Sequence, residues 1–72
     1  MDRGIKQYDV VTLTEDVPRY KLVRGQVGAV VEQYSRDAFE VEFVDRSGHT
    51  YALATLRSEQ LLALRYEPAQ IG

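Results

Sequence analysis

One histidine, three serines and two closely spaced glutamates are the residues of this chain whose chemistry could support catalysis. His49 is the only histidine and cysteine is absent, so the chain offers few of the three or four ligands that zinc requires. The serines are Ser35, Ser47 and Ser58; none lies in a nucleophile motif, and His49 would have to serve as the base for any of them. We therefore predict no catalytic residue, no metal site, no cofactor and no enzymatic activity.

Glu40 and Glu42 superficially resemble the paired carboxylates of a glycosidase, because they project from the same face of one predicted strand. Phe39, Val41 and Phe43 alternate with them and are expected to fill the core, which turns both glutamates toward solvent. Outward charges also discourage unwanted strand pairing. We interpret the two glutamates as surface residues, with an acidic contact surface as the alternative.

The pair Gly25 and Gly28 forms a Gly-x-x-Gly motif, which in other settings can cradle a phosphate. Here no Gly-Lys-Ser/Thr follows, and the motif opens a predicted strand rather than a helix. The two glycines are better explained by strong curvature, a bulge or a close backbone approach in that strand.

The loop Asp16–Arg24, together with an adjacent strand surface, is the part of the sequence that we assign to binding. Its cations follow an acidic residue and surround one tyrosine. A tyrosine beside an arginine is a common interface anchor, because it offers a large amphipathic area at low entropic cost. The candidate interface consists of Asp16, Arg19, Tyr20, Lys21 and Arg24; a solvated charged loop is the alternative.

Length and composition limit what the chain can be. Its 72 residues are enough for one domain with a small core, in which binding at the surface is easier to build than catalysis inside. A net charge of −2 disfavours a broad phosphate-binding surface. No apolar run approaches the roughly 18 residues of a membrane helix, and Met1–Gly4 lacks the hydrophobic stretch of a signal peptide. We expect a soluble, cytoplasmic protein.

The elements that would position these residues are mainly strands. Alternating or β-branched residues predict strands over 8–14, 25–34, 39–43 and 49–56, and residues 61–66 form either a fifth strand or a short helix. We expect Tyr8, Tyr34 and Tyr51 to pack within strands. Asp45 can cap its own turn and Gly48 can take positive φ, which predicts a hairpin. A capping Ser58 predicts a single helical or 3-10 turn over 57–60.

This order of elements predicts an all-β fold, a small five-stranded SH3-like barrel with one 3-10 turn before the last strand. The long loop, with Pro18 at its centre, would flank the usual ligand groove of such a barrel. We place an N-terminal extension over residues 1–7, the barrel over 8–66 and a flexible tail over 67–72.

Four segments resemble the bacterial family known as domain of unknown function 4926, and the similarity runs from about Tyr8 to Leu64. They are Tyr8–Pro18 (YDVVTLTEDVP), Arg24–Val31 (RGQVGAVV), Phe39–Asp45 (FEVEFVD) and Tyr51–Leu56 (YALATL). These are barrel-forming positions, so the resemblance implies the fold and transfers no catalytic residue. It also implies a partner encoded by a neighbouring bacterial gene and an antitoxin-like or immunity-like role.

The predicted function is a non-catalytic protein–protein interaction module in the bacterial cytoplasm, the antitoxin-like neutralising partner of a co-encoded protein. The alternative is a nucleic-acid-binding small β-barrel, motivated by Arg19, Lys21, Arg24, Arg36 and Arg46. A third alternative is a homodimer formed through an open edge of the barrel.

Overall fold

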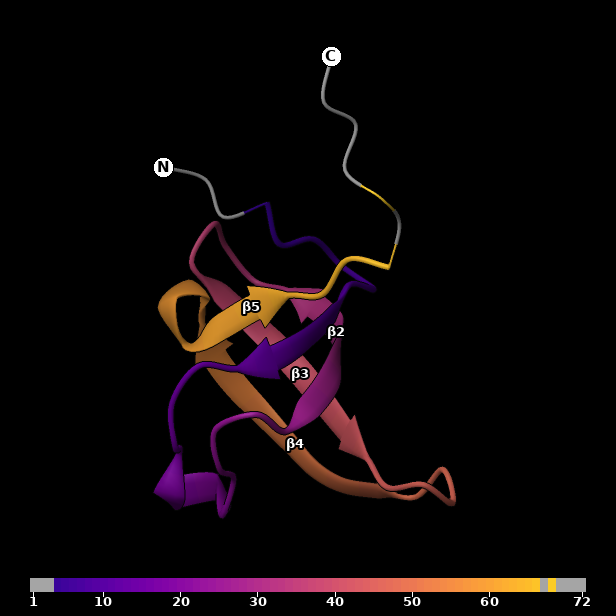
Figure 1. Ribbon diagram of the computed structural model, residues 1–72. Coiled ribbons are helices and arrows are strands. Elements are labelled where there is room, and N and C mark those ends of the chain that lie inside the picture. Colours follow the sequence, from indigo (N-terminus) through magenta and orange to yellow (C-terminus); the bar gives the residue numbers. More distant parts are fainter. Residues whose placement is uncertain (1–3, 67, 69–72) are drawn as a thin grey trace.

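The computed structural model describes residues 4–66 and 68, in which one antiparallel sheet has five strands (Figure 1). The strands are β1 (Val10–Leu13), β2 (Val27–Gln33), β3 (Ala38–Val44), β4 (Thr50–Arg57) and β5 (Leu61–Ala63). Two 3-10 turns accompany them, η1 (Pro18–Tyr20) in the β1–β2 loop and η2 (Ser58–Gln60) before β5. The predicted all-β class and the 3-10 turn before the last strand are confirmed, and η1 is an addition to the prediction.

The sheet curls around one hydrophobic core. Its strand order is β4-β3-β2-β1-β5, and no hydrogen-bonded ladder joins β4 to β5 in the described residues. In Figure 1, β1 and β5 lie in front of β3 and β4, so the inward faces of the two ends of the sheet approach each other. The two ends of the sheet are therefore held together by packing of their inward-facing side chains and not by a hydrogen-bonded ladder. The core residues are Ile5, Val11, Leu13, Val17, Leu22, Val30, Phe39, Val41, Phe43, Ala54, Leu56 and Leu61.

Strand β3 follows the predicted alternation. Phe39, Val41 and Phe43 are at most 1% exposed, and Glu40 and Glu42 lie on the opposite face. Residues 61–66 contain a strand and not a helix, because Leu61 and Ala63 pair with Leu13 and Val11 of β1. That pairing gives β1 a second neighbour.

The turn before β5 is held differently from the prediction. Ser58 is the first residue of η2, and no side-chain hydrogen bond caps the turn from its N-cap position, Arg57. Instead the Gln60 side chain accepts the Arg57 backbone N–H at 2.9 Å. The N-cap position is therefore Arg57 and not the predicted Ser58, and the Gln60 side chain reaches back over the turn.

Two of the three tyrosines assigned to strands lie outside them. Tyr8 precedes β1 in a turn with a φ of +76° and is 77% exposed. Tyr34 follows β2 and is 59% exposed. Tyr51 does lie in β4, with its ring 6.2 Å from that of Phe43. β-propensity alone placed Tyr8 and Tyr34 in strands, and the local turns override it.

The two glycines of the Gly-x-x-Gly motif have separate roles. Gly25 lies in the turn before β2 with a φ of +92°, and Gly28 lies inside β2 facing the core. The bulge of β2 falls between Val30 and Glu32, beyond both glycines. Curvature at this strand therefore combines a close approach at Gly28 with a bulge that lies beyond the motif.

Packing extends beyond the predicted barrel boundary at residue 8, because Ile5 is 5% exposed and belongs to the core. The predicted tail, residues 67–72, lies outside the described residues apart from Pro68. Within the described part of the chain, no helix is long and apolar enough to cross a membrane.

Candidate interaction surface

The β1–β2 loop, residues 14–26, is anchored from within. Val17 and Leu22 are buried in the core and form an isolated β-bridge, with hydrogen bonds of 2.9 and 3.2 Å between their backbones. Between them, η1 ends at Lys21, whose backbone is left-handed with a φ of +59°. This loop therefore has a fixed fold that is packed against the core at two points.

Asp16 closes the base of this unit. Its Oδ1 accepts the backbone N–H of Arg24 at 2.9 Å, across eight residues of loop. Next to it, Gln26 Oε1 accepts the N–H of Val23 at 2.7 Å. The carboxylate predicted to line an interface is thus engaged in holding the loop together.

Tyr20 joins the loop to the far side of the barrel. Its side chain is half-buried against the core, and its hydroxyl accepts the backbone N–H of Thr55 in β4 at 3.4 Å. The Arg19 guanidinium lies over the Tyr20 ring, 5.1 Å from its centroid, in the range of a cation–π contact. Tyr20 consequently supports Arg19 and covers part of the β4 edge.

The outward side of the loop carries the charges. Arg19, Lys21 and Arg24 are exposed, and among residues 4–66 and 68 none of them forms an ion pair within 4 Å. Val23 lies beside them in sequence with 55% of its surface exposed. Sequence reasoning missed Val23, although its position directly after the apolar Leu22 could have indicated that only one of the two reaches the core.

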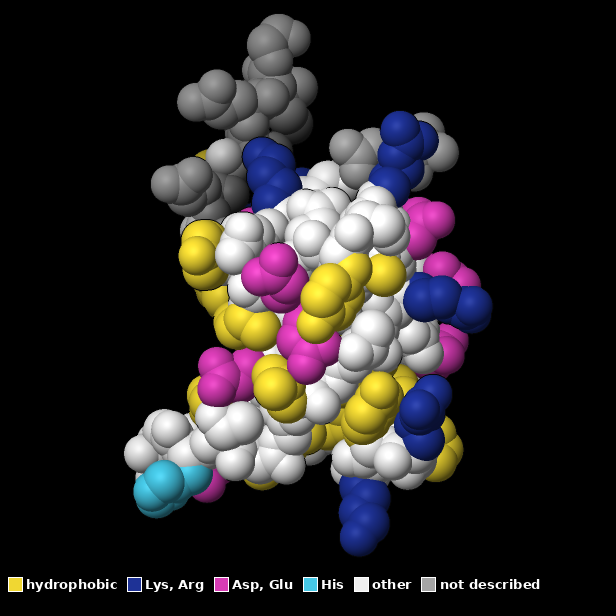
Figure 2. Space-filling view, turned by 180° about the vertical axis from the view of Figure 1, so that it is seen from behind, with side chains coloured by type: hydrophobic (Ala, Val, Ile, Leu, Met, Phe, Trp, Pro, Cys, Tyr) yellow, Lys and Arg dark blue, Asp and Glu magenta, His cyan; other side chains and the backbone are white. Residues whose placement is uncertain are grey.

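The remaining cations divide between the two ends of the sheet. Loops alternate ends along an antiparallel meander, so Arg46 in the β3–β4 turn shares an end with the β1–β2 loop, and Arg36 in the β2–β3 loop lies at the other (Figure 1). Figure 2 shows Lys and Arg side chains on the side where the β1–β2 loop lies. The five cations of the nucleic-acid alternative are not brought onto one surface.

The side chains considered for catalysis are not assembled into a site. His49 is exposed, with Nδ1 3.9 Å from Asp45 Oδ2 in the hairpin turn. Glu40 accepts the Thr55 hydroxyl at 2.8 Å, and Glu42 accepts the Thr50 hydroxyl. Within residues 4–66 and 68, no three His, Cys, Asp or Glu side chains are grouped so as to hold a metal ion.

Tyr34 and Glu40 give the outer face one measurable pH response. Desolvation raises the pKa of Tyr34, and Glu40, which accepts its hydroxyl at 3.3 Å, and Glu32 raise it further. We expect Glu40→Gln to lower the pKa of Tyr34, measured by NMR of labelled tyrosine rings, while Glu59→Gln leaves it unchanged. Because the pKa of Tyr34 is raised in the folded state, the neutral Tyr34 hydroxyl stabilises the fold relative to the unfolded chain. This stabilisation is fully present below the ordinary tyrosine pKa of about 10 and is lost as pH rises through the pKa of Tyr34. An unchanged Tyr34 pKa in Glu40→Gln would contradict the assignment.

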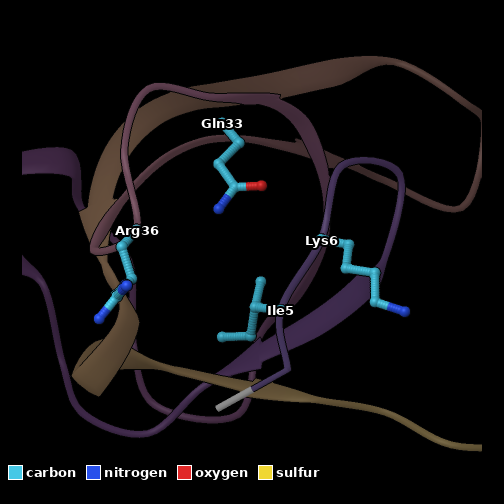
Figure 3. A pocket seen from close by; sticks show the side chains of 4 residues that line it. All are labelled: Ile5, Lys6, Gln33 and Arg36. Carbon is cyan, nitrogen blue, oxygen red and sulfur yellow. The ribbon is translucent and has the colours of Figure 1, made fainter. Parts of the chain in front are cut away.

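An open cavity of about 490 Å³ lies at the end of the barrel near the N-terminal segment, lined by Ile5, Lys6, Gln33 and Arg36. Figure 3 shows Ile5 and Gln33 directed into it and the Lys6 side chain directed away. The Gln33 amide already donates to the Ser35 carbonyl at 3.1 Å. Lys6 and Arg36 therefore do not point together at one position where a ligand could bind.

These features define a small all-β domain: a curled five-stranded sheet with a long folded first loop and a 3-10 turn before its last strand, compatible with the predicted SH3-like barrel. The family model for Domain of unknown function (DUF4926) matches residues 7–63, and the chain belongs to that family, which confirms the resemblance noted in the sequence. Neither the curated proteins nor the solved structures yield a match to the chain.

Proposed function

We propose that this domain is a non-catalytic protein-binding module that uses the outward side of its β1–β2 loop. The observation that carries the proposal is the combination of a firmly anchored loop with unpaired cations on its outward side. Arg19, Lys21 and Arg24 have no acidic partner within 4 Å among the described residues, and Val23 adds exposed apolar area. An anchored loop loses little conformational entropy on binding, so more of the contact energy is available for affinity.

The chemistry of this surface favours an acidic partner protein. Complementary charges accelerate encounter and select among partners, and a central apolar or aromatic contact supplies most of the affinity. In the proposed role the domain is the antitoxin-like neutralising partner of a protein encoded beside it in a bacterial genome, and both proteins act in the cytoplasm. The family resemblance supports a gene-neighbour partner, and the loop supplies a surface for it.

The test is an affinity measurement between the tagged domain and the product of each neighbouring gene. We expect Arg19→Ala with Arg24→Ala to weaken a complex at least about tenfold, because both substitutions remove cations from the proposed centre of the interface. The matched control removes two charges from the opposite end, Lys6→Ala with Arg36→Ala, and should change affinity much less. Equal weakening by both pairs, or none by the loop pair, would show that the loop is not the interface.

A nucleic-acid-binding barrel remains the second candidate, because Arg46 shares its end of the sheet with the cationic loop. Binding to phosphates would weaken steeply with salt. Fluorescence anisotropy with single-stranded DNA and RNA at low ionic strength separates the two candidates. A flat titration removes the second one.

A further inference from the structure

The outer face of the sheet is unusually apolar. In an antiparallel sheet with one face on the core, the other face is normally polar. Here the outward positions include several exposed or half-buried aliphatic residues: Val10, Val27, Ala29, Val44 and Leu53. Val27 and Val44 are each 46% exposed, and Leu53 is 54% exposed.

Strand register gathers these residues into one area. Val10 pairs with Ala29, Ala29 pairs with Glu42, and Glu42 pairs with Leu53, which forms a row across four strands. A shallow groove of about 280 Å³ runs beside this row and is lined by Val10, Val27, Gly28, Ala29, Glu42 and Val44. We call it the outer-face groove.

Acidic side chains continue the same face. Glu32 and Glu40 are direct cross-strand partners, and Glu42 lies two residues from Glu40 on β3. We call these three residues the acidic row. In the described part of the chain none of them has a cation within 4 Å, and Glu40 and Glu42 accept hydroxyl groups instead. Figure 2 shows acidic side chains set among hydrophobic ones on this side of the molecule.

This arrangement is unfavourable for the free domain. Like charges placed directly opposite each other on neighbouring strands repel, and exposed aliphatic area is left in water. A bound segment with the opposite charge would reduce the repulsion between the glutamates and would remove the exposed aliphatic area from water. The acidic row therefore adds to the apolar groove a preference for one kind of partner.

We propose that the outer-face groove and the acidic row together form a docking site for a partner-protein segment that carries aliphatic side chains followed by lysine or arginine. Along β3, the residues Val44, Glu42 and Glu40 follow at two-residue steps of about 7 Å. An extended segment running alongside would place its aliphatic side chains over Val27 and Val44 and its cations beside Glu42 and Glu40. This site shares no residue with the cationic loop surface of the proposed function and is independent of it.

A second copy of the chain fits the site less well. Two copies packed face to face about a two-fold axis would each bring the same patch to the interface, so the acidic row of one copy would meet either the acidic row or the aliphatic residues of the other and would gain no cation there. Like-charge contact across an interface is unfavourable. Charge complementarity thus selects a basic segment over self-association.

The test is an NMR titration of the ¹⁵N-labelled full chain with a synthetic peptide of pattern Val-Ser-Val-Ser-Lys-Ser-Lys. We expect saturable shifts at Val10, Val27, Ala29, Glu42 and Val44, and at least about fivefold weaker binding when glutamate replaces both lysines of the peptide. Shifts confined to other residues, no saturation, or equal binding of the glutamate peptide would each overturn the proposal.

Paired variants separate the two parts of the site. Val27→Thr with Val44→Thr removes apolar contact and keeps β-branched residues in the strands. Glu40→Gln with Glu42→Gln removes two of the three charges of the acidic row. Each pair should weaken peptide binding at least about fivefold. The controls Tyr66→Ser and Glu59→Gln change exposed residues outside the site and should leave affinity unchanged. Spectra of the free variants report folding, and sedimentation of the free chain as a dimer through this face would assign the site to a second copy and overturn the proposal.

Discussion

Gly28→Ala is expected to lower the free energy of unfolding by about 2–3 kcal/mol, a large share of the 3–5 kcal/mol that a core of this size provides. A Cβ at position 28 would lie 2.8 Å from the backbone oxygen of Glu42, 2.8 Å from Val41 Cγ1 and 2.9 Å from Phe43 Cδ2. The oxygen belongs to β3 and cannot withdraw without disturbing its pairing with β2 and β4. Packing in a dense core leaves no room for the added methyl group.

Urea unfolding followed by far-ultraviolet circular dichroism measures this effect, with Gly25→Ala as the matched control. At Gly25 an added Cβ meets nothing within 4 Å, but the φ of +92° strains any L residue, so a loss of only about 1 kcal/mol is expected. The comparison separates overpacking from backbone strain. A Gly28→Ala variant as stable as the wild type, or more stable than Gly25→Ala, would show that β2 and β3 can move apart at this point.

The β3–β4 hairpin shows what the sequence could predict. Strand β3 has a regular two-residue period, and the turn residues have one dominant conformational role each. Asp45 Oδ1 accepts the N–H groups of Ser47 and His49 at 2.8 and 3.0 Å, and Gly48 takes a φ of +86°. These are local contacts between residues at most four apart, so the order of side chains in the chain is sufficient to indicate them.

The roles of Asp16 and Tyr20 in the loop show why the candidate site was only partly predictable. Both were assigned to an interface from their type and their cationic neighbours. Tyr20 bonds to Thr55, which is 35 residues away, and Asp16 bonds to the backbone of Arg24. Such partners depend on how the loop folds back on the barrel, and no local pattern in the sequence contains that information.

The outer-face groove was missed for a different reason. Strand β2 contains Val27, Ala29, Val30 and Val31 with only Gly28 between them, so apolar residues occupy both of its faces. Period-two reasoning then has no polar face from which to tell inside from outside. Register with β1 and β3 is needed to show that Val30 is buried while Val27 is exposed.

Ile5→Ala is expected to cost about 2–4 kcal/mol, although the sequence pattern placed the start of the barrel at residue 8. Ile5 is only 5% exposed and belongs to the same core as Leu13 and Phe39, so removing its side chain leaves a cavity and lost contacts. A lone isoleucine before the first strand has no periodic neighbours that could indicate this burial.

The same unfolding measurement tests this prediction with two companions. Ile5→Val removes one methylene and should cost about 0.5–1.5 kcal/mol. Lys6→Ala changes an exposed neighbour whose side chain points away from the cavity (Figure 3), and should change stability by less than about 0.5 kcal/mol. If the loss of stability decreases in the order Ile5→Ala, Ile5→Val, Lys6→Ala, the N-terminal segment is part of the folded unit, because only core packing distinguishes the three variants. If Ile5→Ala and Lys6→Ala have equal, small effects, the folded unit begins at the turn before β1 and not at Ile5.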